Sequence, residues 1–414
     1  MDSKHKKSAA GKASGRRQFR IASLPCSSSN RLLSGIIAAF YLIGTVLHSP
    51  VTAGAPFITI IRPNFTASYH EFIDTSGAFL ASEDGSFEAR ITNPNDTETF
   101  YLVVAHVSSN TIVWTANRNS AISGASELRL TTDGFSLHDT AGYTVWSASN
   151  LSSVVSALRL LTTGNLVLLD AAKNSLWESF DYPTDVLLAG QNLRRGRFLV
   201  SSVSSEDLSE GIYRLTVGDD DATLTWKGLN YWVLSTDTNA FRLTNFRVEY
   251  LAMNSSGVYL MGSTVEQTVI ELHFNVPATF SGIQIVKLEA TGALTIVSRN
   301  STATAQLFSA PTDPCRLPMI CGRAGICTSD TKGGSCVCDT EFTPDQETAS
   351  GAGCVPKDAS LALPSPCNGS SGDANVEYLN MTNVSLNGNV RTSVREIVLV
   401  LAYSTERIMA IASP

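Results

Sequence analysis

Three tryptophans recur along the chain at a nearly constant interval, and this repeat constrains the fold more than any other feature of the sequence. Trp114, Trp146 and Trp177 each follow an aliphatic residue and are 32 and 31 residues apart. Between them, Leu-Arg-Leu-Thr-Thr-Asp-Gly at 128–134 recurs 30 residues later as Leu-Arg-Leu-Leu-Thr-Thr-Gly at 158–164. A unit this short cannot bury its own apolar face, so neighbouring units must share a core. We therefore expect three units packed about one axis, with one tryptophan from each filling the core.

The composition of the segments around this repeat predicts strands. Apolar stretches such as 100–104 and 166–169 have strand length, carry β-branched or aromatic residues, and are bounded by turn formers such as Asp133-Gly134. No stretch shows the sustained i, i+3, i+4, i+7 apolar spacing of a helix. The sequence thus predicts an all-β chain.

Two β domains are expected, over residues 55–190 and 195–305. In the second, Leu-Glu-Ala-Thr-Gly-Ala-Leu at 288–294 repeats the turn signal of the first more faintly. A degenerate second copy of the first domain would show this pattern.

The amino terminus predicts entry into the secretory pathway. A basic segment is followed by an uncharged run from Leu32 to Leu47 and by the small-residue step Val51-Thr52-Ala53. The apolar run has 16 residues, fewer than the roughly 20 of a spanning helix. Residues 1–53 are therefore expected to be a cleaved signal peptide or an uncleaved anchor. In both cases the rest of the chain is extracellular, either secreted or tethered to the plasma membrane.

Cysteines and glycosylation sequons agree with this compartment. Six of the eight cysteines fall between Cys315 and Cys354, which predicts a small disulfide-bonded domain over 311–356. A zinc site is disfavoured because it would use Cys-x-x-Cys pairs, which are absent, and reduced thiolates. Cys367 has no evident partner. The eight sequons lie at Asn64, Asn95, Asn150, Asn254, Asn300, Asn368, Asn380 and Asn383.

Charge and motif content exclude several classes of function. The net charge is −7 and no basic stripe occurs beyond the first twenty residues, so we expect no nucleic-acid partner. The chain contains no Gly-x-Ser-x-Gly, no His-Glu-x-x-His and none of the phosphate-loop, His-Arg-Asp or Asp-Phe-Gly motifs of a kinase. We expect no enzymatic activity, no metal and no cofactor.

Three motifs resemble the plant S-locus-glycoprotein-like and G-type lectin receptor kinases. They are Thr-Ile-Val-Trp-Thr-Ala-Asn-Arg-Asn at 111–119, Gly-Asn-Leu-Val-Leu-Leu-Asp at 164–170, and Leu-Trp-Glu-Ser-Phe-Asp-Tyr-Pro-Thr-Asp at 176–185. The resemblance implies a bulb-type lectin domain, a β-prism of three sheets, over 55–190. An S-locus-glycoprotein-like β domain at 195–305 and an EGF-like domain at 311–356 would follow it.

The same resemblance also implies a disulfide pattern and an order of later domains. An EGF-like module implies the pairs Cys315–Cys327, Cys321–Cys336 and Cys338–Cys354, whereas sequence alone allows fifteen connectivities. In the family a PAN domain, a membrane span and a kinase come next. Residues 357–414 are therefore expected to be a truncated PAN-like start or a disordered tail.

A sugar site is expected only in degenerate form. Mannose-binding bulb lectins use Gln-x-Asp-x-Asn-x-Val-x-Tyr, whose alternate residues face one side of a strand and present donors and acceptors to hydroxyls. One repeat keeps Asp133, and the next keeps Asn165 and Val167. These three are the candidate carbohydrate-binding residues, although turn formation alone explains Asp133 and Asn165.

Three functions are compatible with these observations. The leading one is an extracellular recognition module that binds a mannose-type glycan, a cell-wall carbohydrate or a protein ligand. A second is a non-catalytic decoy or co-receptor that contacts a related receptor-kinase ectodomain without binding sugar. The third is a non-functional gene fragment, which the unpaired Cys367 and the tail would suggest.

Overall fold

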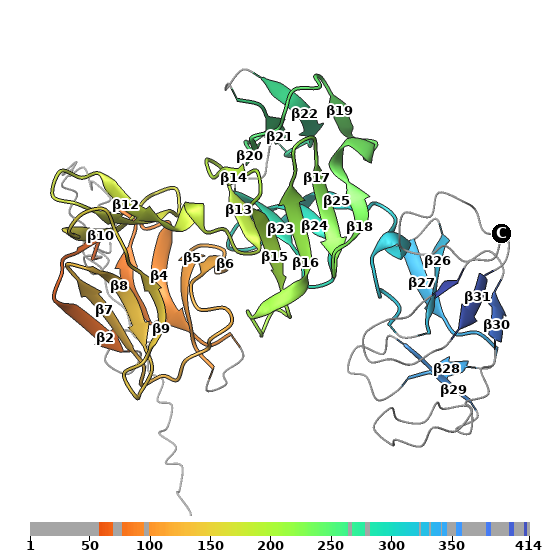
Figure 1. The fold of residues 1–414 in the computed structure, drawn as a ribbon, viewed down its shortest axis with the longest axis horizontal. Coiled ribbons are helices and arrows are strands. Elements are labelled where there is room, and N and C mark those ends of the chain that lie inside the picture. The colour runs from red at the N-terminus through yellow and green to blue at the C-terminus, as the bar shows by residue number, and fades with distance from the viewer. Residues whose placement is uncertain are drawn as a thin grey trace, which may run out of the picture. The chain divides into compact units, whose positions relative to one another are not determined.

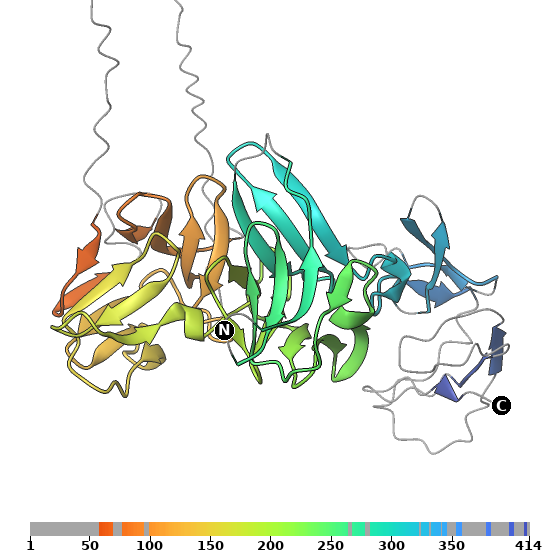
Figure 2. The ribbon, with the colours of Figure 1, turned by 90° about the horizontal axis from the view of Figure 1, so that it is seen from above.

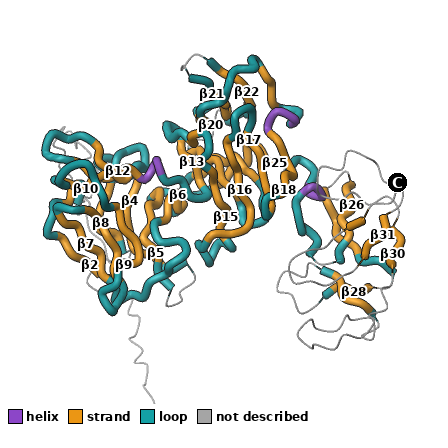
Figure 3. The backbone as a smooth tube through the Cα atoms, viewed as in Figure 1, coloured by secondary structure: helices purple, strands orange, loops and turns teal. Residues whose placement is uncertain are grey.

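A computed structural model of the chain describes residues 58–68, 77–94, 99–263, 267–277, 282–322, 324–330, 333–340, 342–345, 353–357, 378–381, 397–400 and 410–411. The signal segment expected at 1–53, the sequons at Asn95, Asn368 and Asn383, and the side chain of Asn380 lie outside the described part. Within that part strands predominate (Figure 3). Its helical segments are three short 3-10 turns, η2 (Ser179–Asp181), η3 (Leu234–Thr236) and η4 (Pro314–Arg316). The all-β prediction is confirmed.

The first group of strands forms three antiparallel sheets of four strands each (Figure 1). One has the order β1 (Ile60–Ile61), β10 (Ala157–Leu160), β11 (Leu166–Leu169), β12 (Ser175–Glu178). Another has the order β2 (Phe65–Ser68), β7 (Glu127–Thr131), β8 (Gly134–His138), β9 (Thr144–Ala148). The last has the order β3 (Ala78–Ala81), β4 (Phe87–Thr92), β5 (Tyr101–His106), β6 (Thr111–Thr115). This is the three-sheet arrangement that the repeat predicted.

The repeated tryptophans meet in the shared core, as expected. Trp114 on β6, Trp146 on β9 and Trp177 on β12 belong to three different sheets. Their ring centroids are 5.7 to 5.8 Å apart in all three pairs, and each pair is edge to face. Edge-to-face contact is the favoured geometry because the positive edge of one ring meets the negative face of the next. One indole from each repeat thus closes the core.

The turn of the repeat explains why glycine ends it. Gly164 follows β10 and has a φ of 85°, a left-handed value that favours glycine. A Cβ added there would lie 2.8 Å from Leu188 and 2.9 Å from Phe87. In the same turn the Leu161 amide donates to the Asn165 carbonyl oxygen at 2.9 Å. The turn therefore fixes where Asn165 enters β11.

A second group of strands also forms three antiparallel sheets (Figures 1 and 2). One has the order β13 (Val186–Leu188), β23 (Ile283–Leu288), β24 (Leu294–Arg299), β25 (Thr304–Ala310). Another has the order β14 (Leu193–Arg194), β20 (Tyr250–Met253), β21 (Gly257–Met261), β22 (Thr268–His273), β19 (Ala240–Arg242). The last has the order β15 (Phe198–Ser202), β16 (Glu210–Val217), β17 (Ala222–Trp226), β18 (Leu229–Val233).

The faint repeat at 288–294 coincides with a turn of the same kind. The Glu289 amide donates to the Ala293 carbonyl at 2.8 Å, as Leu161 does to Asn165, and Gly292 has a φ of 87°. A second three-sheet group with this turn is what a degenerate copy of the first group would show. The domain limits at 190 and 195 remain a prediction, and β13 pairs with β23 of the second group.

The sheet that contains β13 lies between two cores. Leu188 and Ile285 belong to the core of the first group, whereas Leu187 and Val286, their neighbours in sequence, belong to the core of the second. Since alternate residues of a strand face opposite sides, this sheet buries both of its faces. Because both faces of the sheet are buried, β13 is apolar at every position from Val186 to Leu188.

The cysteine module has two small antiparallel sheets. They are β26 (Ile326–Asp330) with β27 (Gly333–Val337), and β28 (Phe342–Pro344) with β29 (Cys354–Pro356). The disulfides are Cys315–Cys327, Cys321–Cys336 and Cys338–Cys354, the pairs that the EGF-like resemblance implied. In the tail, β30 (Tyr378–Met381), β31 (Ile397–Val400) and β32 (Ala410–Ile411) form a sheet. No helix among the described residues has the length and apolarity to cross a membrane.

Candidate functional site

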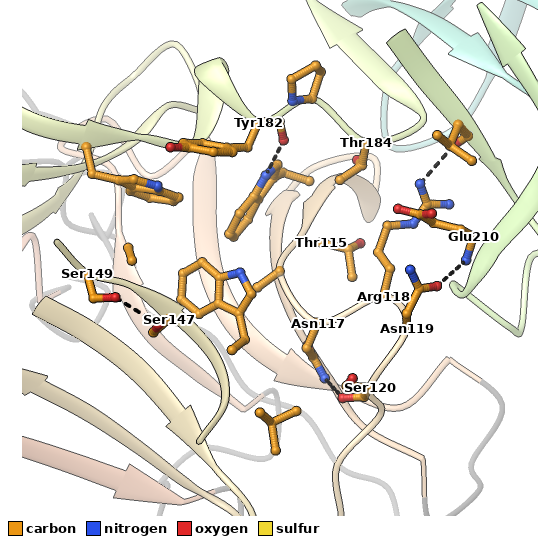
Figure 4. Close-up of a pocket in the computed structure, with 18 of the residues that line it drawn as sticks. Thr115, Asn117, Arg118, Asn119, Ser120, Ser147, Ser149, Tyr182, Thr184 and Glu210 are labelled. Carbon is orange, nitrogen blue, oxygen red and sulfur yellow. Dashed lines mark hydrogen bonds between the residues drawn. The ribbon is translucent and has the colours of Figure 1, made fainter. Parts of the chain in front are cut away.

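A hollow with a volume of about 400 Å³ opens beside the three tryptophans (Figure 4). Residues of β6, β9 and β12 line one side of it, and residues of β15 and β16 line the other. We call it the tryptophan hollow. Its lining comprises Trp114 to Ser120, Val145 to Ser149, Trp177, Tyr182 to Thr184, Phe198, Val200 and Glu210.

Tyr182 supplies an exposed aromatic ring at this hollow. It follows η2, and its ring stacks on Trp177 with a centroid distance of 5.6 Å and an interplanar angle of 18°. The indole Nε1 of Trp114 donates to the Tyr182 carbonyl oxygen at 2.8 Å, so the backbone is fixed as well. Tyr182 is nevertheless 50% exposed. A held, exposed ring of this kind is suited to packing against the apolar face of a ligand.

Asn117 uses its side chain to hold the chain that follows β6. Its Oδ1 accepts from the Leu102 amide at 2.8 Å, and its Nδ2 donates to the carbonyl oxygens of Phe100 and Ser120 at 3.2 and 3.0 Å. With 3% of its surface exposed, it is a structural residue of the wall.

Arg118 joins the first group of strands to the second. Its guanidinium donates to the carbonyl oxygens of Leu208, Val200 and Ser201, each at 2.8 Å. It also donates to Ser202 Oγ at 3.2 Å, and that hydroxyl donates to Asp185 Oδ2 at 3.0 Å. Burial lowers the pKa of Arg118, while the carboxylate of Asp185 acts in the opposite direction. Arg118 is 6% exposed, and four of its five N–H groups donate to atoms of the second group of strands, so its main role is to hold the wall of the hollow in place.

The rim of the tryptophan hollow carries exposed polar groups. Ser147 and Ser149 lie on one side, with their hydroxyl oxygens 3.1 Å apart. Asn119 lies on the other, where its Oδ1 accepts from the Glu210 amide at 3.2 Å (Figure 4). The Nδ2 of Asn119 and the carboxylate of Glu210 face the same opening. Hydroxyl, amide and carboxylate groups around an aromatic floor match the hydrogen-bonding needs of a sugar.

The three residues predicted from the lectin motif lie elsewhere and are not brought together. Asp133 is exposed in the turn between β7 and β8. Asn165 is 5% exposed, and it donates to Glu178 Oε2 at 2.9 Å and accepts from Ser179 Oγ and the Phe180 amide at 3.1 and 3.2 Å.

Val167 is 3% exposed in the middle of its sheet. Its partners across the neighbouring strands are Arg159 and Glu178. Neither Val167 nor Asn165 lines the tryptophan hollow, and contact of the three motif residues with sugar stays a prediction.

Sequence reasoning missed Tyr182 and the rim as candidate site residues. In the sequence the segment 176–185 carries only a family resemblance, and the three tryptophans are predicted to be core residues. That interpretation is correct for Trp114 and Trp177, which are 5% and 9% exposed, but both also line the hollow. The sequence feature that could have indicated this site is Tyr182, an aromatic residue that directly precedes Pro183 and follows the last tryptophan repeat.

Comparison with known proteins places the chain among lectin-like ectodomains. The family model of the D-mannose binding lectin matches residues 111–202, which include most of the lining of the tryptophan hollow. A G-type lectin S-receptor-like serine/threonine-protein kinase of Arabidopsis thaliana is 38% identical over 336 residues, which are 79% of this chain and 37% of the kinase. This chain thus spans little more than a third of that relative.

Two further proteins are similar. An S-locus-specific glycoprotein of Brassica oleracea is 28% identical over 313 residues, covering 68% of this chain and 69% of the glycoprotein. The two-domain Scilla campanulata agglutinin, a fetuin-binding protein, is 14% identical and aligns with 60% of this chain and 100% of its own, with a TM-score of 0.22. That score is too low to bear on fold or ligand. The repeat, the three motifs, the lectin match and the two plant relatives agree: the chain belongs to the plant family of G-type lectin S-receptor-like kinases and S-locus glycoproteins, through their bulb-type lectin ectodomain.

Proposed function

We propose that this chain is an extracellular recognition module that binds carbohydrate in the tryptophan hollow. The observation that carries the proposal is the ring of Tyr182, held on Trp177 yet half exposed, at the edge of a hollow with polar groups on opposite rims. Pyranose rings present apolar C–H faces and equatorial hydroxyls, and these two features need an aromatic surface and nearby donors and acceptors. The match to the D-mannose binding lectin family supports a hexose as the ligand.

A glycan array with matched variants tests this proposal. The chain is expressed in a secreting eukaryotic host, and wild type is compared with Tyr182→Ala and with Tyr143→Ala. Tyr143 is 74% exposed and does not line the hollow, so it is a control for loss of an exposed tyrosine. We expect Tyr182→Ala to weaken binding about tenfold, the equivalent of one aromatic contact, and Tyr143→Ala to leave it unchanged.

The array also separates the two candidate sugar sites. Asp133→Ala tests the motif residue that is exposed, and it should affect binding only if the degenerate lectin motif is the site. If Asp133→Ala lost binding and Tyr182→Ala bound normally, the degenerate lectin motif would be the sugar site in place of the tryptophan hollow. No glycan signal from a folded, disulfide-bonded sample would exclude carbohydrate binding.

Glycosylation at Asn150 has to be controlled in this experiment. Asn150 follows Ser149, which lines the tryptophan hollow, and it is exposed. A glycan on Asn150 would therefore stand at the mouth of the site. The array is run on protein before and after enzymatic removal of N-glycans, which also tests the sequon and secretion predictions.

Recognition of a protein without sugar is the second candidate function. Phe241, Leu243 and Phe246 lie within six residues at and beyond the edge strand β19, and they are 57%, 54% and 52% exposed. Clustered exposed apolar side chains mark interaction surfaces more often than single ones do. This surface supports the decoy or co-receptor hypothesis, and pull-down of a related receptor-kinase ectodomain that is lost in Phe241→Ser would favour it. Retention of the chain in the endoplasmic reticulum would instead favour a non-functional fragment.

A further inference from the structure

Two further hollows continue from the tryptophan hollow across the surface. One, of about 350 Å³, is lined by Phe180, Asp181, Tyr182, Pro183, Asn192, Arg194 and Arg197. It shares Tyr182 and Pro183 with the tryptophan hollow. The next, of about 340 Å³, is lined by Asn192, Arg194, Arg195, Glu249 and Tyr250, and shares Asn192 and Arg194 with the one before it. We call these two the arginine groove. The groove and the tryptophan hollow are neighbours because they share lining residues, and we refer to them together as the path.

The backbone holds the arginines of this groove in fixed places. Arg194 is in β14, and its partner across the sheet is Tyr250, which lines the same groove. The Arg197 amide donates to the Arg194 carbonyl oxygen at 2.9 Å in a tight turn. Gly196 within that turn has a φ of 77°, which glycine adopts without strain. Arg194 and Arg197 are thus presented by a short, ordered turn.

The arginines of the groove differ in whether they form ion pairs. Arg195 is neutralised by Asp219 at 2.8 Å and Glu249 at 3.2 Å. Over the described residues, no carboxylate lies within ion-pair distance of Arg194 or Arg197. Asp181 and Glu249 are the acidic residues that line the groove beside them. The groove therefore has two guanidinium groups that can bind an anion, and two carboxylates, of which Glu249 is paired with Arg195 and Asp181 can accept from a hydroxyl.

An aromatic ring lies next to these cations. The guanidinium carbon of Arg197 is 6.0 Å from the centroid of the Tyr182 ring, and the same ring is stacked on Trp177. A ligand that packs on Tyr182 consequently has a guanidinium within reach. Arginine binds a carboxylate in a planar, bidentate geometry, which a neutral sugar cannot use.

We propose that the path formed by the tryptophan hollow and the arginine groove binds acidic oligosaccharides, with the carboxylates of uronic acid residues on Arg194 and Arg197. The inference rests on the proposed function and narrows its ligand class. An acidic peptide would also meet the two cations, but it would not need a stacked ring flanked by hydroxyl, amide and carboxylate groups. The extended series of hollows fits several linked sugar units better than one.

The test compares a charged oligosaccharide with its neutral form. The probes are oligogalacturonate and its fully methyl-esterified derivative, which have the same backbone, and the measurement is isothermal titration calorimetry at two salt concentrations. Wild type should bind oligogalacturonate at least about tenfold more tightly than the ester, and the difference should shrink at high salt. Arg194→Gln and Arg197→Gln should each weaken oligogalacturonate binding about tenfold and leave binding of the ester unchanged.

Arg247→Gln is the matched control, because it removes one exposed positive charge that is paired with Asp219 and does not line the groove. It should leave both affinities unchanged. Equal binding of acid and ester would overturn the inference while leaving carbohydrate recognition intact. Equal binding of poly-glutamate would assign the groove to acidic peptides. Binding of neither saccharide would overturn this inference, whereas the glycan array decides separately whether the proposed carbohydrate function stands.

Discussion

The guanidinium Nη1 of Arg118 donates to the carbonyl oxygen of Val200 at 2.8 Å, across 82 residues of sequence. Through this bond and those to Ser201 and Leu208, the segment after β6 is joined to β15 and to the loop before β16. One wall of the tryptophan hollow comes from each side of this junction. Arg118, which itself lines the hollow, therefore joins its two walls.

Replacing Arg118 should destabilise the protein strongly. Arg118→Met leaves three buried carbonyl oxygens without a donor and Asp185 without its counter-charge. Removing one partner from a buried charged network costs about 3 to 5 kcal/mol, so we expect a loss of unfolding free energy of about that size in urea titrations. Hydrogen exchange should show faster exchange at Val200 to Ser202 before the core strands are affected.

Arg129→Gln is the control for this prediction. Arg129 pairs with Glu127 at 2.6 Å on the surface of β7 and is 40% exposed, so its loss should change stability by less than about 1 kcal/mol. Similar effects of the two substitutions would contradict the role assigned to Arg118.

Asn165 should prove more important for stability than for direct contact with a ligand. Asn165→Ala removes the acceptor of Ser179 Oγ and of the Phe180 amide, and the donor to Glu178. Leaving such buried groups unpaired costs about 1 to 3 kcal/mol, measured by thermal or urea unfolding. Asp133→Ala, in an exposed turn, should cost less than about 0.5 kcal/mol. A stable Asn165→Ala protein that has lost sugar binding would instead make Asn165 a ligand residue.

The features that the sequence predicted are those set by local periodicity. A tryptophan every 31 to 32 residues required three equivalent units, and the three indoles meet as expected. Gly164 lies in a turn whose positive φ favours glycine. Gly292, in the fainter repeat of the same sequence pattern, has a similar positive φ. These signals succeed because a strand, a turn and a repeat are each determined by residues close in sequence.

The candidate site depends on residues far apart in sequence, and its chemistry was not predictable from one segment. Arg118 could be recognised as part of a motif, but its carbonyl partners at 200, 201 and 208 have no side-chain signature at all. Conversely, the lectin motif indicates Asn165 and Val167 because alternate residues of an extended segment share a face. Val167 is buried where β11 pairs with β10 and β12, and Asn165 is buried where it forms hydrogen bonds with Glu178, Ser179 and Phe180. Contacts between segments far apart in sequence thus determine which polar side chains are exposed and available to a ligand.

Loss of the Cys338–Cys354 disulfide should affect only the end of the cysteine module. The two cysteines are 16 residues apart in sequence, and Cys354 lies in β29, which pairs with β28. A disulfide that closes a loop of this size should contribute about 3 kcal/mol to the local fold. The Cys315–Cys327 bond is closer to the second core, where Leu317 is buried and the Tyr213 hydroxyl donates to the Pro318 carbonyl at 2.9 Å.

Limited proteolysis of the two double serine variants separates these effects. In Cys338→Ser/Cys354→Ser, cleavage should be confined to residues after 338. In Cys315→Ser/Cys327→Ser, the β strands of the second group should also become less stable to heat. Identical unfolding temperatures for the second group in both variants would show that the module is independent of it.

Stability should decrease as the pH falls below the ordinary pKa of histidine, and His106 should cause part of the decrease. Burial lowers the pKa of His106 below its usual 6.5, and the nearby Asp84 only partly opposes this. The ring packs on Phe87 with a centroid distance of 5.3 Å, and its Nδ1 lies 2.8 Å from Ser109 Oγ. Below pH 6.5 the unfolded chain takes up a proton that the folded ring resists, so the unfolded state gains stability.

The contribution of His106 is thus fully present above pH 6.5 and is lost as the pH falls from there through the lowered folded pKa. Asp84, Asp207 and Asp219 have pKa values held below 3.8 by hydrogen bonds from serine or arginine side chains, so their contributions are lost at more acidic pH. Urea midpoints measured between pH 7.5 and about pH 5 therefore isolate the histidine. His106→Gln should flatten the slope in this range. An unchanged slope in His106→Gln would assign the pH dependence to other groups.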